Sequence, residues 1–146
     1  MKDSEPSSAL SFFMQELSDR NLLILKDGQT LLESRKEGMK PLLAALRCLG
    51  RTGLRRTVVI DKIVGKAAAL LMAYFQPKEV YCGTLSQRAE AIFKRYGLSY
   101  KATRVVPEIL CRTEDDLCPF EKAVLDLETP VDCYNILMLM VLSFSS

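Results

Sequence analysis

Residues 57–75, TVVIDKIVGKAAALLMAYF, decide the fold, because a predicted strand runs directly into a predicted helix there. The short β-branched run TVVI is typical of a buried strand. A helix is expected to begin near Val64 or Gly65, where Lys66 precedes nine uncharged and mostly apolar residues. Because such a helix has no polar face, it is expected to be buried. A buried strand followed by a buried helix is the unit from which α/β proteins are built.

Before this stretch, the sequence predicts a helix, a β-hairpin and a second helix. The hairpin is indicated by residues 21–34, NLLILKDGQTLLES, where two apolar runs flank Asp27-Gly28, a pair suited to a tight turn with positive φ. The segment MKPLLAALRCLG predicts a helix that ends at Gly50, and GRTGLRR predicts a basic loop. The first helix is amphipathic, with apolar residues at helical spacing, namely Leu10, Phe13, Met14 and Leu17.

After this stretch, two further strands and several helices are expected. The segments KEVYCG and LSYKATRVV predict the strands, and between them TLSQ indicates a capping box with Thr84 as the N-cap. Gly97 ends the helix that follows, and this helix is expected to bury Ala89, Ile92, Phe93 and Tyr96. PEILCRTEDD predicts a short helix and a turn. The last two helices are expected to open at Cys118-Pro119 and at Thr129-Pro130.

The alternation of strands and helices predicts an α/β fold. Alternation implies parallel strands with helices on both faces, while the hairpin adds an antiparallel edge. We therefore expect a three-layer α/β/α sandwich with a mixed sheet of about five strands. Residues 1–20 are expected to form a helical extension packed on the body, and residues 21–146 a single α/β/α domain.

The composition is that of an ordinary globular domain. The chain has 146 residues, of which 49% are hydrophobic and 26% charged. The net charge of +2 is too small to indicate binding to nucleic acid or to an acidic membrane. The apolar run YNILMLMVLSF has 11 residues, whereas a membrane span needs about 20. We therefore expect neither a membrane nor a nucleic-acid partner.

The five cysteines have wide spacings and include no Cys-x-x-Cys pair, so they are expected to be free thiols. The opening segment MKDSEPSSAL lacks the apolar core of a secretory signal. Both observations predict a cytoplasmic location. Cys48 and Cys133 lie within helical patterns and are expected in the core.

Lys66 is the first candidate for a functional residue. A helix N-terminus carries about half a positive charge, so a lysine in the first turn needs a negative neighbour. That neighbour could be a carboxylate of the protein, or an anion from solution bound by the free amides beside Gly65. Ligands of open α/β sheets lie at the carboxyl ends of the strands, where Asp61 and Lys66 are expected. Alternatively, Lys66 pairs with Asp61 or Glu121 and has a structural role only.

Cys118 and Glu121, in the segment CPFEK, are the second candidate. A thiol at a helix start has a lowered pKa, and a carboxylate one turn away could make the pair a nucleophile and an acid–base catalyst. Alternatively, Cys118 is an inert N-cap and Glu121 a capping acid. Cys82 ends a predicted strand and could point into the same crevice as Lys66.

Two further sets of residues are expected to have ordinary roles. Arg51, Arg55 and Arg56 form a basic loop that could touch phosphates, although a solvated loop is the expectation without interleaved aromatic residues. Tyr81 and Tyr96 could stack on a base, but their spacing favours packing.

The segment DKIVGKAAALLM, followed later in the chain by CPFEK, resembles a small uncharacterised bacterial family of unknown function within the cytidine deaminase-like superfamily. The likeness runs from about Asn21 to Leu137 and implies a three-layer deaminase-like fold. It also implies a crevice with a lysine at its rim, which suits a small anionic ligand such as a nucleotide. The motif positions that match are Asp61, Gly65, Lys66, Cys118, Pro119 and Glu121.

The resemblance does not imply deamination. Zinc deaminases bind their metal through a His or Cys near one helix start and a Pro-Cys-x-x-Cys at the next junction, with a glutamate that moves protons. This chain has no histidine, its first helix start reads Val64-Gly65-Lys66, and its second junction, YCGTLSQ, has the single cysteine Cys82. Because a catalytic zinc needs three protein ligands, we predict no metal and no cofactor.

Three functions remain open at this point. The first is a metal-free deaminase-like domain that binds a small anionic, nucleotide-like ligand at Asp61, Gly65, Lys66 and Cys82. The second is an enzyme that uses Cys118 as its nucleophile. The third is a structural homodimer formed through the C-terminal helix, which is apolar on more than one side.

Overall fold

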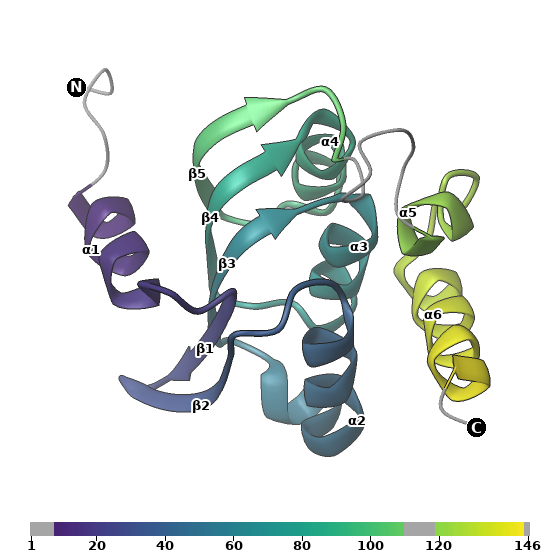
Figure 1. The fold of residues 1–146 in the computed structure, drawn as a ribbon, viewed down its shortest axis with the longest axis horizontal. Helices are drawn as coiled ribbons and strands as arrows, with labels where there is room; N and C mark the ends of the chain where they lie inside the picture. The colour runs from purple at the N-terminus through teal and green to yellow at the C-terminus, as the bar shows by residue number, and fades with distance from the viewer. Residues whose placement is uncertain (1–7, 110–118, 145–146) are drawn as a thin grey trace.

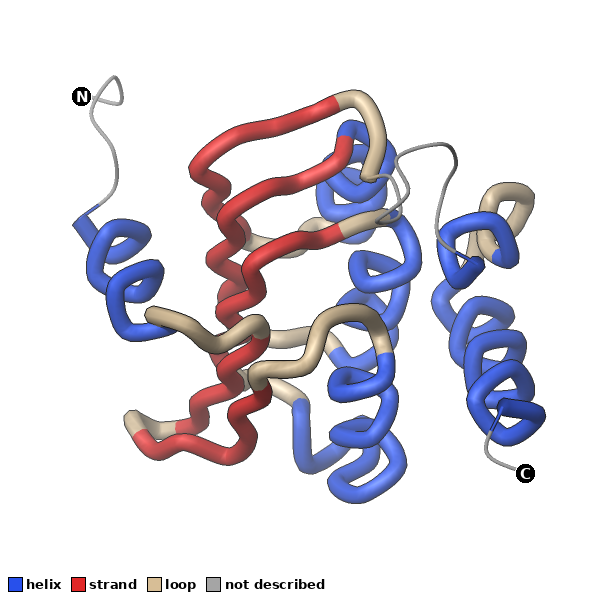
Figure 2. The backbone as a smooth tube through the Cα atoms, in the orientation of Figure 1, coloured by secondary structure: helices blue, strands red, loops and turns tan. Residues whose placement is uncertain are grey.

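The computed structural model describes residues 8–109 and 119–144, and its centre is one mixed sheet of five strands in the order β2-β1-β3-β4-β5. Strands β3, β4 and β5 are parallel, while β1 is antiparallel to both β2 and β3. The tube in Figure 2 shows the strands as one layer with helices on both sides. The strands are β1 (Leu22–Lys26), β2 (Gln29–Ser34), β3 (Val58–Val64), β4 (Glu79–Ser86) and β5 (Tyr100–Val106).

The helices are divided unequally between the two faces of the sheet (Figure 1). Helix α1 lies alone on one face, the next three cover the other face, and α5 and α6 pack outside α3. Every residue of α3 except Tyr74 is buried, so its outer surface needs cover, and α6 supplies it. The helices are α1 (Ser8–Leu17), α2 (Lys40–Leu54), α3 (Lys66–Phe75), α4 (Gln87–Tyr96), α5 (Pro119–Ala123) and α6 (Pro130–Phe144).

These features confirm the α/β/α fold that the sequence predicts, with its mixed sheet and N-terminal hairpin. The hairpin turn has the expected chemistry, because Asp27 and Gly28 both have positive φ, at 51° and 80°. The prediction that Thr129-Pro130 opens the last helix is also confirmed: the Thr129 hydroxyl accepts a hydrogen bond from the Asp132 amide at 3.3 Å.

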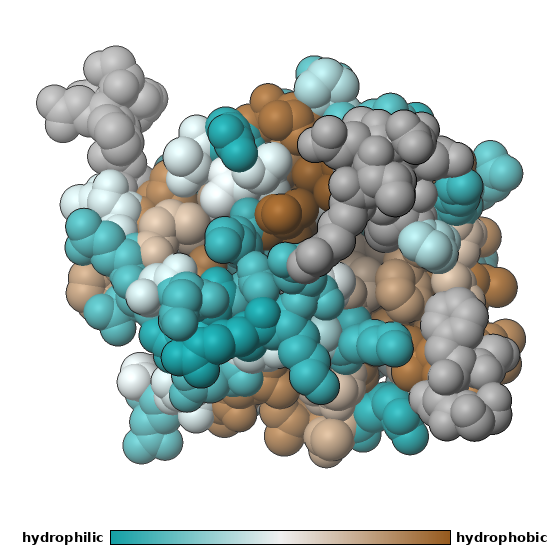
Figure 3. Space-filling model, in the orientation of Figure 1, coloured by the Kyte–Doolittle hydropathy of each residue, from teal (hydrophilic) through white to brown (hydrophobic). Residues whose placement is uncertain are grey.

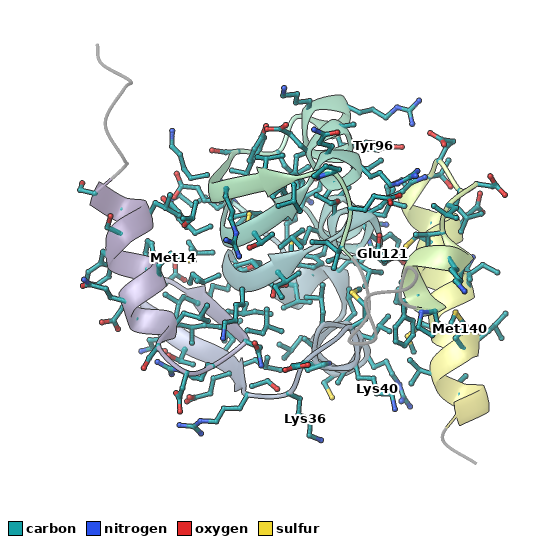
Figure 4. All side chains as sticks on the ribbon, turned by 45° about the horizontal axis from the view of Figure 1, so that its top comes forward. Met14, Lys36, Lys40, Tyr96, Glu121 and Met140 are labelled. Atoms are coloured by element: carbon teal, nitrogen blue, oxygen red, sulfur yellow. The ribbon has the colours of Figure 1, made fainter. Side chains whose placement is uncertain are left out.

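Two hydrophobic clusters hold the layers together. The larger lies between the sheet and α2, α3, α4 and α6, and includes Phe75, Phe93 and Leu137. The smaller lies under α1, where the ring centroids of Phe13 and Tyr81 are 4.8 Å apart. Figure 4 shows Met14 on α1 and Met140 on α6, at opposite sides of the molecule. The amphipathic first helix therefore docks on the sheet as predicted.

The first segment of helix α2 ends at Gly50 as predicted, and a further helical turn follows it. Gly50 leaves the helical conformation, with φ 68° and ψ 177°, but the chain turns helical again and continues to Leu54. Leu54 is fully buried, so its packing favours the extra turn. Part of the predicted basic loop is consequently helical.

Helix α4 begins two residues later than the capping box predicts. Ser86 is the N-cap, and its hydroxyl accepts a hydrogen bond from the Ala89 amide at 3.0 Å. Thr84 remains in β4 because the neighbouring strands pair with it on both sides. Gly97 ends the helix as predicted.

Two predictions of burial are wrong. Tyr96 is 37% exposed, because its ring lies at the end of α4 rather than on the buried side with Phe93. Cys48 is exposed on α2, whereas Cys133 is buried in the core as expected. The helical pattern placed Cys48 in a helix but did not fix which side of the helix faces the sheet.

The segment PEILCRTEDD lies mostly outside the described residues, and so do Cys111 and Cys118. Helix α5 begins at Pro119, where the sequence predicts a helix start. Within residues 8–109 and 119–144, no helix has the length and apolarity that crossing a bilayer requires.

Candidate functional site

The first turn of α3 is capped by a carboxylate from α5. Glu121 accepts hydrogen bonds from the Lys66 amide at Oε1 and from the Ala67 amide at Oε2, both at 2.9 Å. The Glu121 side chain is buried, and Figure 4 shows it between α3 and α5. The negative neighbour expected at this helix start is therefore a carboxylate of the protein itself.

Gly65 makes this cap possible by having no side chain. A Cβ atom on Gly65 would lie only 2.6 Å from Glu121 Oε2 and 2.7 Å from the carboxyl carbon. The φ angle of −101° at Gly65 is open to any residue, so close approach rather than backbone conformation requires the glycine. Gly65 and Glu121 are thus a matched pair.

The side chain of Lys66 reaches away from Glu121 toward the connection between α5 and α6. Its Nζ donates to the Leu125 carbonyl at 3.0 Å and lies 3.7 Å from Glu128 Oε2. The lysine side chain is 8% exposed, whereas that of Glu128 is 61% exposed. The ammonium is therefore held within the fold and meets a carboxylate that the sequence reasoning did not find.

Burial raises the pKa of Glu121, while the two amide hydrogen bonds and the Lys66 charge act in the opposite direction. Cys133 lies close by, and its thiol donates to the Ala67 carbonyl at 3.7 Å. Burial and the nearby Glu121 carboxylate raise the pKa of Cys133 to about 12, so this thiol is neutral near pH 7. It has the character of a packed core residue.

Asp61 and Cys82 form a separate pair on the sheet, where they face each other across β3 and β4. Burial raises the pKa of Asp61 to about 7, although amides of Ile63 and Lys62 partly offset this. Burial, Asp61 and Glu90 raise the pKa of Cys82 to about 12. Its thiol donates to the Lys101 carbonyl at 3.5 Å.

The sequence-predicted site residues are therefore divided into two groups. Gly65, Lys66 and Glu121 come together at the start of α3, whereas Asp61 and Cys82 are side by side within the sheet. Asp61 forms no ion pair with Lys66, since the partner of the lysine is Glu128.

A catalytic pair of Cys118 and Glu121 is not described by the structure, because Cys118 lies outside the described residues. Both carboxylate oxygens of Glu121 already accept amide hydrogen bonds. This arrangement agrees with the alternative of a capping acid, although the helix that Glu121 caps is α3 and not its own.

A pocket of about 290 Å³ opens beside Lys66. We call it the Lys66 pocket; its lining residues are Lys66, Arg88, Ala91, Ile92, Arg95 and Glu128. Arg88 and Arg95 are seven positions apart on α4, with Ala91 and Ile92 between them, so helical periodicity brings all four to one side. This spacing was the sequence signal that could have located the two arginines.

The described residues do not fit a zinc site of the deaminase kind. In residues 8–109 and 119–144, no three His, Cys, Asp or Glu side chains gather in a way that could hold a metal ion. A catalytic zinc needs three protein ligands and an open position. The carboxylate at the start of α3 is instead committed to backbone amides.

Known proteins resemble this chain in both sequence and fold. A crystal structure of a DUF1893 family protein, TM1506, from Thermotoga maritima is 26% identical, with a TM-score of 0.79 over 96% of this chain and 95% of that one. A structure described as Acinetobacter baumannii RibD, form 2, is 16% identical, with a TM-score of 0.48 over 82% of this chain and 42% of that one. No curated protein matches.

The sequence model of one family spans nearly the whole described chain. Residues 13–140 match the model for TM1506, described as a domain of unknown function, DUF1893. This span includes both motifs on which the resemblance to an uncharacterised family rested. The chain therefore belongs to the DUF1893 (TM1506) family.

Proposed function

We propose that this protein binds a small anionic ligand that carries a phosphate group, and that it does so in the Lys66 pocket. The observation that carries the proposal is the grouping of three cations, Lys66, Arg88 and Arg95, around one concavity, where Glu128 is the one acid that the described part of the chain contributes to the lining. The ammonium of Lys66 is nearly buried and anchored by the Leu125 carbonyl. Binding a ligand would therefore cost little further side-chain entropy at this lysine.

The acids that now neutralise these cations are exposed and replaceable. Glu128 lies 2.6 Å from Arg95 and 3.7 Å from Lys66, with 61% of its side chain exposed. Arg88 pairs with Glu108 at 3.1 Å, and both are close to half exposed. Exposed ion pairs contribute only about 0–1 kcal/mol. A phosphate carries more charge and can accept two hydrogen bonds from one arginine, so it can compete with Glu128 for these partners.

This proposal keeps the anionic ligand predicted from the sequence but moves its contacts. The amides at the start of α3 are occupied by Glu121, so the ligand would meet the side chains of Lys66 and the α4 arginines instead. Asp61 and Cys82 do not line the pocket. Ala91 and Ile92 give it an apolar wall, as is usual in small-molecule sites.

Calorimetric titration with inorganic phosphate and pyrophosphate tests the proposal. Arg88→Gln is expected to weaken binding about tenfold, because one charged hydrogen-bonding partner is lost. Glu128→Gln is expected to strengthen binding, because it removes the internal competitor. Arg47→Gln, which changes an exposed arginine of α2 remote from the pocket lining, is the matched control and should leave binding unchanged.

Thermal unfolding offers a second readout, since a ligand at 100 times its dissociation constant adds about 2.7 kcal/mol of stability. A flat response to both compounds would refute the proposal. Equal affinities of wild type and Arg88→Gln would show that binding occurs elsewhere on the protein.

A second function, homodimer formation, is favoured by the outer surface of α6. Val131, Leu139 and Leu142 are 51%, 61% and 52% exposed. Their helical spacing places them on one side, opposite the buried Cys133 and Leu137. Figure 3 shows hydrophobic side chains at the edge of the molecule where α6 lies. We propose that a second copy covers this apolar stripe through a two-fold axis.

Light scattering during size-exclusion chromatography tests this pairing. Wild type is expected to have the mass of a dimer, and Leu139→Lys that of a monomer, because a charge would be buried without a partner. Leu49→Lys, at an apolar residue of α2 that is 40% exposed, is the control and should remain dimeric. A wild-type protein that stays monomeric at high concentration would exclude the dimer.

A further inference from the structure

A second concavity lies at the end of the sheet where the amino ends of the parallel strands meet. It measures about 480 Å³ and is formed by the three connections that lead into β3, β4 and β5. We call it the amino-edge pocket. Its chemically distinctive lining residues are Arg55, Arg56, Lys78, Tyr96 and Ser99.

The charge of the amino-edge pocket is uncompensated. Arg55, Arg56 and Lys78 are all exposed, and none of them forms an ion pair with another residue of the described chain. No acidic residue among residues 8–109 and 119–144 lines the pocket. In the Lys66 pocket, by contrast, every cation has a carboxylate partner. Three neighbouring cations without counter-charge create a positive potential that attracts anions.

Backbone hydrogen bonds link the two segments that carry these cations. Arg56 and Gln76 both have positive φ, at 63° and 57°, although neither is glycine. The Arg56 amide donates to the Gln76 carbonyl at 3.0 Å, and the Lys78 amide donates to the Thr57 carbonyl at 2.7 Å. The two basic loops are therefore tied to each other. Left-handed conformations of this kind cost energy and cluster at functional sites.

Tyr96 adds an aromatic ring to the same pocket. The ring is 37% exposed, and its hydroxyl donates to the Glu128 carbonyl at 2.8 Å, which fixes the orientation of the side chain. Gly97 follows directly and also lines the pocket, so no side chain at that position blocks access to the ring. An exposed, oriented ring beside cations provides a surface on which a nucleobase can stack.

We propose that the amino-edge pocket binds a nucleoside phosphate, with the phosphate on Arg55, Arg56 and Lys78 and the base stacked on Tyr96. The cations and the ring together indicate a nucleoside phosphate. Cations alone would suit any phosphate, and a ring alone would suit a free base. The basic loop and the tyrosine that the sequence singled out separately thus act in one site. The site uses different cations from the Lys66 pocket and does not rest on the function proposed for that pocket, although Glu128, which lines that pocket, also accepts the Tyr96 hydrogen bond.

The test is calorimetric titration of the full chain with AMP, adenosine and ribose 5-phosphate. AMP is expected to bind more tightly than either of the other two, because only AMP has both groups. The double variant Arg55→Gln, Lys78→Gln is expected to bind AMP about tenfold or more weakly, through loss of two phosphate partners. These side chains are exposed, so the variant is expected to fold normally.

The ring is tested separately from the charges. Tyr96→Leu is expected to reduce AMP affinity about tenfold while leaving ribose 5-phosphate unchanged, because only the base loses its stacking partner. Tyr96→Phe keeps the ring, so its AMP affinity is expected to stay within about twofold of wild type. Equal loss of both ligands in Tyr96→Leu would overturn the stacking role.

Arg88→Gln, in the Lys66 pocket, separates the two proposals. It is expected to leave the AMP binding that depends on Tyr96 and Lys78 unchanged. AMP binding that is lost in Arg88→Gln but kept in the Arg55, Lys78 double variant would overturn the amino-edge site and support the Lys66 pocket. Failure of AMP to bind at millimolar concentration, with binding only of a single-stranded oligonucleotide, would overturn the nucleotide assignment.

Discussion

The variant Glu121→Ala is expected to lower the free energy of unfolding by about 3 kcal/mol, one of the two largest effects that we anticipate in this protein. The carboxylate satisfies the amides of Lys66 and Ala67, and both bonds are buried. An unsatisfied buried donor costs about 1–3 kcal/mol. A truncated side chain also leaves Lys66 without the nearby negative charge of Glu121.

Chemical denaturation at neutral pH measures this effect. Glu121→Gln is expected to cost about 2 kcal/mol, because one amide retains an acceptor while the other faces an N–H group. Asp126→Asn, at an exposed carboxylate of the connection between α5 and α6, is the control and should change stability by less than about 0.5 kcal/mol.

Gly65 allows the same contact to be tested from the other side. Gly65→Ala should destabilise wild type, since its Cβ would collide with the Glu121 carboxylate. The same change should be nearly harmless in the Glu121→Ala background, where the space is free. Additive effects of the two substitutions would contradict the proposed contact, because residues in contact are expected to couple.

Asp61→Asn is expected to stabilise the protein at pH 8 by about 2 kcal/mol and to have almost no effect at pH 4. The folded-state pKa of Asp61 is raised from 3.8 to about 7, chiefly by burial. The folded protein therefore holds a proton that the unfolded chain releases, so stability from this group is present below pH 4 and lost as pH rises to about 7. Such a pKa difference corresponds to at most about 4 kcal/mol, and residual solvent contact of Asp61 reduces it.

The measurement is the difference in unfolding free energy between wild type and Asp61→Asn at a series of pH values. Taking this difference cancels the titration of all other groups. The expected curve is flat below about pH 4, rises up to about pH 7 and is flat again above it. A constant difference across this range, or a destabilised variant at pH 8, would show that Asp61 is not held at a raised pKa.

A gain in stability on substituting Asp61 by Asn would also indicate that Asp61 is kept for a reason other than stability. A carboxylic acid with a pKa near 7 is suited to moving protons at physiological pH, and such groups concentrate at functional sites. Its neighbour Cys82 has a raised pKa and stays neutral there, so the pair consists of one group that titrates near pH 7 and one that does not. Natural sequences keep destabilising residues where function needs them.

The antiparallel hairpin and the parallel strands that follow it were predicted from local features of the sequence. The Asp27-Gly28 turn, the β-branched run before Lys66 and the helix stop at Gly97 each reflect chemistry within a few residues. The same local reasoning failed at Thr84, where pairing with strands on both sides extended β4 beyond the predicted cap. It placed the helix stop at Gly50 correctly but did not predict the extra helical turn that follows and buries Leu54.

The candidate site depended more strongly on distant contacts. The sequence indicated that Lys66 needs a negative neighbour and named Glu121 among the possibilities. It did not indicate that Glu128 would be the partner of the ammonium, or that the arginines of α4 would line the same pocket. It grouped Asp61 and Cys82 with Lys66, although the strand register pairs the first two with each other.

By itself, then, the sequence determined the α/β architecture, the single hairpin edge and the requirement for a negative group near Lys66 at the start of α3. Periodicity, turn chemistry and the helix dipole determine these features, and all three act over short stretches of chain. Only the tertiary structure decided which group meets that need. Glu121 is 55 positions from Lys66 along the chain, and the packing of α5 against α3 brings its carboxylate to the amides. The two pockets arise in the same way, from residues of separate elements that become neighbours only in the folded chain.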